Sequence, residues 1–148
     1  MARKSTQTFT DDERAAMKEH AAEVRASASR RGSKADKAAD DLKALLEKIE
    51  EMSEADRAMA SRVHSLILES APELAPKLWY GMPAYYKGTK SVCFFQPAQK
   101  FKTRYATLGF NEDAALDDGD LWPVAYALQE LTPAVEKRIA ALIKQAAG

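Results

Sequence analysis

The sequence is poor in the residues that build disulfides, zinc sites and membrane spans. Its 148 residues include one cysteine, Cys93, so no disulfide can form within the chain. The two histidines, His20 and His64, are too few for an ordinary zinc site of cysteine and histidine ligands. No apolar run reaches the roughly 18 residues of a membrane-spanning helix. The basic start MARKSTQTF is not followed by the apolar segment of a secretory signal, so we expect a cytoplasmic protein.

One long stretch also lacks acidic residues. Between Glu73 and Glu112 there is no Asp or Glu, but there are six basic residues and nine of the twelve aromatic residues. The next stretch, from Glu112 to Glu130, holds six acids and no Lys or Arg. The net charge of zero therefore hides two opposed blocks. Nucleic-acid binding is not expected, because phosphate contacts usually require a strong basic excess. The local basic and aromatic block instead favours recognition of an anion.

Helices are predicted from caps and from apolar spacing. Thr10 and Glu13 form a capping box, which predicts a helix to about Ser29. Two apolar stripes, at 42–52 and 59–67, predict a helical hairpin with Ser53 as the cap between its helices. Thr132 before a proline predicts the start of a C-terminal helix.

The N-terminal helix has a thin apolar face, so we expect it to depend on docking to another part of the chain. The segment 30–34 (RRGSK) contains a glycine and predicts a flexible connector. Residues 1–34 are therefore expected to form an N-terminal helix and connector, which act as a lid on a domain of residues 35–148.

The hydrophobic pattern changes after Leu78. Segments rich in aromatic and β-branched residues predict strands at Trp79–Tyr86, Ser91–Gln96, Phe101–Leu108 and Trp122–Leu128. Pro83 lacks an amide donor, which predicts a bulge or a strand edge at residues 81–83. The predicted fold class is α+β: the helical hairpin and the C-terminal helix pack on an antiparallel meander sheet of three to four strands, with the N-terminal helix added.

A basic, aromatic groove on this sheet is the predicted binding site. Its expected ligand-binding residues are Trp79, Tyr85, Tyr86, Lys102, Arg104 and Trp122. A guanidinium and an ammonium bind carboxylate or phosphate, and rings pack on flat ligands. The alternative is that Lys102 and Arg104 lie in water or pair with the acidic loop 117–120, and that the rings belong to the core.

The expected function is a binding module for a small anionic molecule or a partner protein, and a homodimer is left open. The sequence shows no nucleophile–base pair, no phosphate-binding glycine loop and no metal triad. We therefore expect no enzyme activity, no cofactor and no resident metal. Cys93 lies between apolar residues and is expected to be buried.

The segment Leu78-Trp79-Tyr80-Gly81-Met82-Pro83-Ala84-Tyr85, preceded by Ala71-Pro72-Glu73, resembles the YdhG-like domain family. The resemblance covers roughly residues 38–147. It implies an α+β fold with helices packed on an antiparallel sheet. Because some members are described as frataxin-like intracellular iron chaperones, iron delivery is the alternative function. Lysines interleave with the carboxylates of residues 36–54, which argues against an acidic iron-binding ridge.

Overall fold

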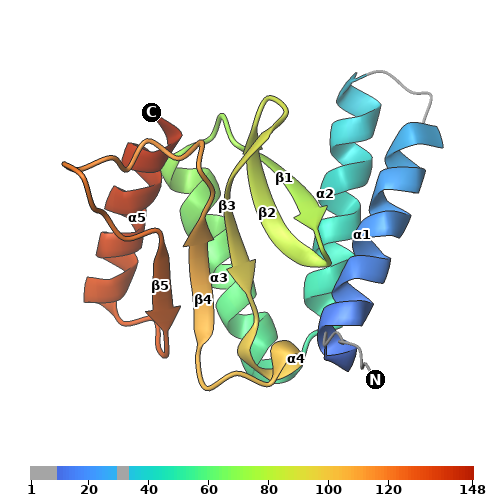
Figure 1. The fold of residues 1–148 in the computed structure, drawn as a ribbon, viewed down its shortest axis with the longest axis horizontal. Helices are drawn as coiled ribbons and strands as arrows, with labels where there is room; N and C mark the ends of the chain where they lie inside the picture. Colours follow the sequence, from blue (N-terminus) through green and yellow to red (C-terminus); the bar gives the residue numbers. More distant parts are fainter. Residues whose placement is uncertain (1–9, 30–33) are drawn as a thin grey trace, which may run out of the picture.

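The computed structural model describes residues 10–29 and 34–148, and it shows helices packed on one antiparallel sheet (Figure 1). The elements are α1 (Asp11–Ser29), α2 (Lys34–Glu50), α3 (Glu54–Ser70), β1 (Ala75–Trp79), β2 (Met82–Lys87), β3 (Lys90–Gln96), α4 (Ala98–Phe101), β4 (Ala106–Phe110), β5 (Ala125–Leu128) and α5 (Pro133–Ala147). The predicted α+β class is confirmed, with α2 and α3 as the helical hairpin. The predicted connector lies, except for Lys34, outside the described residues.

The helix starts follow the predicted caps. Thr10 Oγ1 accepts a hydrogen bond from the Glu13 amide at 3.0 Å, and the Glu13 carboxylate accepts one from the Thr10 amide at 2.9 Å. Ser53 caps α3 and Thr132 caps α5, and each side-chain oxygen accepts a hydrogen bond from the amide three residues later. These local bonds satisfy amides that have no partner inside the helix, which is why the helix starts could be read from the sequence.

The sheet has five strands in the order β1-β2-β3-β4-β5, each antiparallel to its neighbour. The additional strand is β1, which lies almost wholly before the strand predicted at Trp79–Tyr86, while β2 covers only the later part of that segment. Tyr80 and Gly81 have φ angles of 52° and 76°, the left-handed values of a two-residue hairpin turn, so β1 ends before them and β2 begins after them. This turn takes the place of the bulge expected at residues 81–83.

The strand predicted at Phe101–Leu108 is also wrong in its first half. The chain forms the short helix α4 there, which ends at Lys102 in the left-handed conformation with φ 56°. The carboxylate of Asp56, only 5% exposed, accepts hydrogen bonds from the amides of Gln99 and Lys100 at 3.1–3.3 Å. Because this distant side chain caps α4, Lys102 and Arg104 lie before β4 rather than on it.

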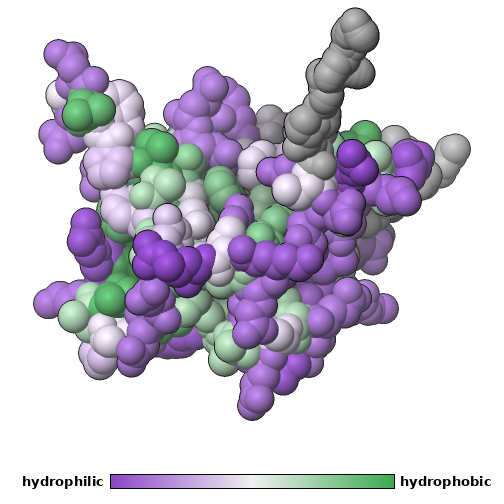
Figure 2. Space-filling view, turned by 60° about the horizontal axis from the view of Figure 1, so that its bottom comes forward, coloured by the Kyte–Doolittle hydropathy of each residue, from purple (hydrophilic) through white to green (hydrophobic). Residues whose placement is uncertain are grey.

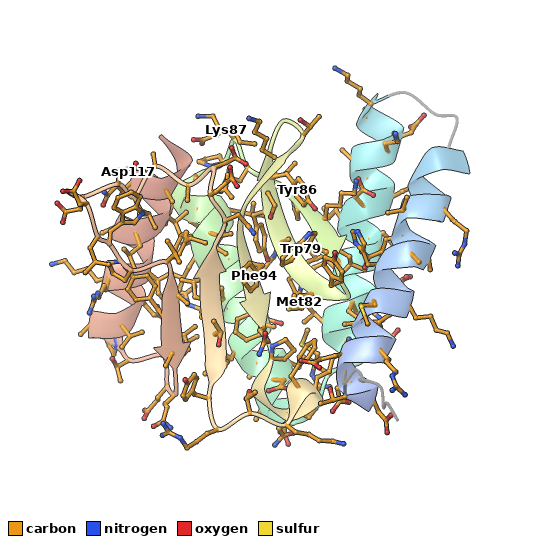
Figure 3. All side chains as sticks on the ribbon, in the orientation of Figure 1. Trp79, Met82, Tyr86, Lys87, Phe94 and Asp117 are labelled. Carbon is orange, nitrogen blue, oxygen red and sulfur yellow. The ribbon has the colours of Figure 1, made fainter. Side chains whose placement is uncertain are left out.

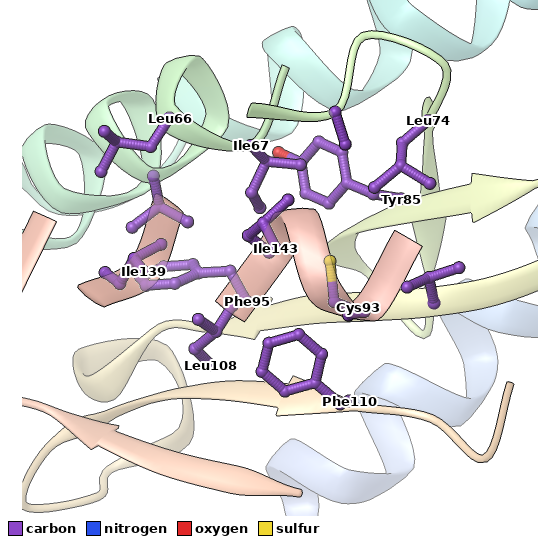
Figure 4. Close-up of a cluster of buried hydrophobic side chains, with 14 of the residues drawn as sticks. Leu66, Ile67, Leu74, Tyr85, Cys93, Phe95, Leu108, Phe110, Ile139 and Ile143 are labelled. Carbon is purple, nitrogen blue, oxygen red and sulfur yellow. The ribbon is translucent and has the colours of Figure 1, made fainter. Parts of the chain in front are cut away.

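The main core lies between one face of the sheet and helices α3 and α5 (Figure 4). Alternate residues of the central strands face it, because successive strand side chains point to opposite faces. Tyr85 and Cys93 are partners in register, as are Phe95 and Leu108. The helices contribute the buried side chains Leu66, Ile67, Ile139 and Ile143. At the β1 edge of the sheet, α1 and α2 lie side by side next to β1 (Figure 1).

The opposite face of β3, β4 and β5 is only partly covered. Phe94 and Thr107 are half-buried there, whereas Ala125 and Ala127 are exposed. Gly109 lies opposite Phe94, and its missing side chain lets the ring lie against the strand (Figure 3). On the face that Figure 2 shows, hydrophilic side chains divide the hydrophobic surface into small areas.

We predict that Gly109→Ala destabilises the protein by about 1–3 kcal/mol, because the new methyl group would overlap the Phe94 ring. In a Phe94→Ala background the same change should be neutral or stabilising by about 0.4–1 kcal/mol, since alanine restricts the unfolded chain. Urea unfolding of the four chains of this double-mutant cycle measures both effects. An equal penalty in both backgrounds would contradict this packing.

Candidate functional site

The structure does not bring the six expected ligand-binding residues together. Trp79 and Tyr86 lie on β1 and β2 (Figure 3). Tyr85 is fully buried, and its hydroxyl lies 2.9 Å from His64 Nδ1 on α3. Burial lowers the pKa of His64 and raises that of Tyr85 well above its ordinary value. Both groups are therefore neutral near pH 7, and this contact belongs to the core rather than to a groove.

The other three expected residues lie outside the strands. Lys102 Nζ is 3.5 Å from Asp12 Oδ2 on α1, so its partner is not the acidic loop that the sequence suggested. Arg104 packs over the Tyr105 ring at 5.1 Å. Trp122 lines a hollow of about 450 Å³ with carboxylates of the loop 111–124, including Asp117, on the β5 side of the molecule (Figure 3). That hollow is acidic, so it does not suit an anion.

Lysine side chains line each of two further hollows. The first of these places lies at the contact between α1 and the rest of the domain, where Asp12, Glu19 and Glu23 meet positively charged or donor groups. We call these three residues the acidic stripe. Opposite them lies the basic surface, which we define as Lys48, Lys100 and Lys102.

Glu19 forms the centre of the first place. Its carboxylate lies 2.9 Å from Lys48 Nζ on α2 and 3.0 Å from Lys100 Nζ on α4. Burial acts to raise the pKa of Glu19, but the hydrogen bonds from the two lysines outweigh it and hold that pKa below the ordinary value of 4.5. The three side chains are each less than one-third exposed, so they join α1, α2 and α4 in a partly desolvated network.

Glu23 contacts the β1–β2 turn. One carboxylate oxygen accepts a hydrogen bond from the Gly81 amide at 3.0 Å. The other lies 3.6 Å from His20 Nδ1, and neither of these two atoms has a hydrogen-bond partner among residues 10–29 and 34–148. The imidazole of His20 stacks on the Tyr80 ring at 3.9 Å. Burial raises the pKa of Glu23 above 4.5, although the Gly81 amide opposes this shift.

The second place is a hollow of about 480 Å³ between α2 and the strands β1 and β2, which we call the α2 hollow. Three lysines line it, Lys34, Lys37 and Lys77, together with one carboxylate, Asp41. Lys77 Nζ lies 5.6 Å from the centre of the Tyr86 ring, which forms part of the same wall. Sequence reasoning found Tyr86 but missed the lysines of α2, because these are brought to the strands only by tertiary packing.

Among residues 10–29 and 34–148, no three His, Cys, Asp or Glu side chains are grouped so that they could hold a metal ion. Over the same ranges, no helix is both long and apolar enough to cross a membrane.

No protein-family model, no curated protein and no solved structure matches this chain. The resemblance to the YdhG-like domain family therefore stays a prediction from the Trp79–Tyr85 segment and the order of the elements.

Cys93 is fully buried, as predicted, and burial raises the pKa of its thiol to about 12. Since the thiolate is the reactive form, we predict that a disulfide reagent such as dithionitrobenzoate does not modify the folded protein at pH 8. Addition of a denaturant should then expose one equivalent of thiol. Rapid modification of the folded chain would contradict this burial.

The opposite pKa shifts of Glu19 and Glu23 predict opposite effects of glutamine substitution. Glu19→Gln removes a carboxylate that stabilises the docked position of α1. This stabilisation is present above pH 4.5 and is lost as the pH falls through the lowered pKa of Glu19. Glu23→Gln removes a charge whose burial is unfavourable above its raised pKa, while the amide oxygen can still accept from Gly81.

At pH 7, amide hydrogen exchange in α1 should be several-fold faster in Glu19→Gln and unchanged or slower in Glu23→Gln. The difference between wild type and Glu19→Gln should vanish well below pH 4.5. If both variants speed exchange equally, the distinct roles assigned to the two carboxylates are wrong.

Proposed function

We propose that this protein is a non-catalytic binding module that holds a small anionic ligand in the α2 hollow. The observation that carries the proposal is the charge around this hollow, where three lysines face one carboxylate. Within the part of the chain that the structure describes, none of these lysines forms an ion pair. Mutually repelling ammonium groups around a hollow favour an anion as the occupant.

The walls of the hollow suit a compact ligand with both charged and flat parts. Its volume of about 480 Å³ falls within the range of small-molecule sites, roughly 300–1,000 Å³. Ala75 and Pro76 supply apolar wall, and Tyr86 supplies a ring. Burial, together with the nearby charges of Glu23 and Asp41, raises the pKa of Tyr86. Its phenol therefore stays protonated and can donate a hydrogen bond to the ligand.

The other hollows support this function less well. The hollow beside Arg104 also contains Asp56 and Glu130, so its two carboxylates outnumber its one guanidinium. The hollow at Trp122 is acidic. For iron delivery, the described residues offer no group of three His, Cys, Asp or Glu side chains placed to hold a metal ion, and so no observation favours that alternative over anion binding.

The test is a calorimetric titration of the full chain with inorganic tripolyphosphate and, separately, with citrate at low ionic strength. We expect binding of at least one of the two probes, and at least a tenfold loss of affinity in Lys37→Ala/Lys77→Ala, because charge-assisted hydrogen bonds contribute about 1.5–3 kcal/mol each. Tyr86→Phe should weaken binding to a smaller extent.

The matched control is Lys43→Ala/Lys137→Ala, which removes the same charge from exposed positions outside the hollow. This variant should bind as the wild type does. Absence of binding by the wild type at millimolar concentration, or an equal loss in the control, would show that the α2 hollow is not an anion site.

A further inference from the structure

We infer that α1 is a displaceable cover on a docking surface for a partner protein, and that the partner presents an acidic helix in place of α1. This interface does not depend on the α2 hollow, since the two places share no lysine. The thin apolar face of the N-terminal helix already suggested a lid. The structure supplies the contacts that define what the covered surface recognises.

The acidic stripe meets the basic surface at Asp12 and Glu19, about two helical turns apart, and meets the Gly81 amide at Glu23. Asp12, Glu19 and Glu23 lie on one side of α1, at spacings of seven and four residues that bring side chains to the same helix face. Asp12 meets Lys102, and Glu19 bridges two lysines. The domain thus already binds an acidic helix, which is the chemistry expected of a partner.

The β1–β2 turn is shaped for this close approach. A side chain at position 81 would overlap the carboxylate of Glu19 where it now lies, and the φ of +76° also favours glycine there. The same residue donates its amide to Glu23, one helical turn further on. Tyr80, in the other turn position, offers its ring to His20. The turn therefore contacts the face of α1 that carries Glu19, His20 and Glu23, with one hydrogen bond to Glu23 and one ring contact to His20.

α1 is held by few apolar contacts, which makes displacement feasible. Of its side chains that the structure describes, only Ala16 is buried. Met17 is 37% exposed and Val24 54%, so the larger apolar side chains contribute little. Partly exposed ion pairs add only weak stabilisation and are screened by salt. Such a helix belongs to the low-stability part of a fold, which opens without global unfolding.

The surface beneath α1 needs a replacement for Glu19. The two lysines that bind Glu19 line a hollow of about 500 Å³, and Glu19 forms part of its wall together with Glu51 and Asp56. When α1 leaves, Lys48 and Lys100 lose the carboxylate that lies between them, while Lys48 keeps Glu51 Oε1 at 3.5 Å. Their repulsion is relieved again by a carboxylate from another helix, whereas a basic or neutral helix cannot relieve it.

The experiment uses a fluorescent peptide with the sequence of residues 11–29 and the full chain carrying Glu19→Lys. This substitution places a third ammonium against Lys48 and Lys100 and so releases the chain's own α1. By fluorescence anisotropy, we expect the peptide to bind the Glu19→Lys chain at least tenfold more tightly than the wild type, whose own helix competes at high effective concentration. The affinity should fall steeply with added salt.

The matched controls exchange the charges. A peptide that itself carries Glu19→Lys should not bind the Glu19→Lys chain, but it should bind a chain carrying Lys48→Glu/Lys100→Glu. Equal binding of both peptides, or no loss when Lys48 and Lys100 become alanine in the Glu19→Lys chain, overturns the inference. Binding of RNA or anionic vesicles by the Glu19→Lys chain without any response to the peptide overturns it as well.

A measurement on the wild type complements these variants. Amide hydrogen exchange should show α1 at least a hundredfold less protected than α3, with protection falling further when excess peptide is added. Protection of α1 equal to that of α3 would mean that α1 is a fixed part of the fold and not a cover. The proposed anion site is tested with tripolyphosphate and the α2-hollow variants, so failure of one proposal is distinguishable from failure of the other.

Discussion

The buried carboxylate of Asp56 fixes the position of α4 and, with it, of Lys100 and Lys102. It sits in the first turn of α3 and accepts the amides of Gln99 and Lys100, so that α4 is tied to the start of the helical hairpin. From this position Lys100 reaches Glu19, and Lys102 lies near Asp12. A buried carboxylate that accepts two backbone amides is costly to remove, because its partners would be left without acceptors. Asp56 therefore supports the two ion pairs of α1 that involve Lys100 and Lys102, although its own hydrogen bonds are made to α4.

Much of the fold could be predicted because its determinants are local. Caps at Thr10, Ser53 and Thr132 act on amides three residues away, so the helix starts follow from short motifs. The strand predictions failed where the structure depends on distant residues or where the sequence pattern fits more than one structure. The turn at Tyr80 and Gly81 lies inside an aromatic run that reads as one strand, and α4 depends on a capping group more than forty residues distant.

The candidate site was predicted less well than the fold, although the charge pattern was informative. The acid-free block does contain Lys77, Lys100 and Lys102, which contribute to the two charged places. Their neighbours, however, come from α1 and α2, and sequence order gives no indication of which helix packs beside which strand. Tyr85 shows a second difficulty, which is to predict the face of the sheet to which a strand residue points. A shift of one residue in the strand register moves an aromatic ring from one face to the other, and Tyr85 faces the core.

The position of Glu23 has a consequence for both proposed sites. Its carboxylate binds the Gly81 amide when α1 is docked, and its charge also acts on Tyr86 at the wall of the α2 hollow. Departure of α1 would remove a negative charge from the vicinity of that hollow and strengthen its attraction for an anion. Thermodynamic linkage makes such an effect mutual, so an anion in the hollow would weaken the hold on α1 and assist exchange for the partner helix. The α2 hollow and the basic surface, which have no lysine in common, would then be coupled in their binding.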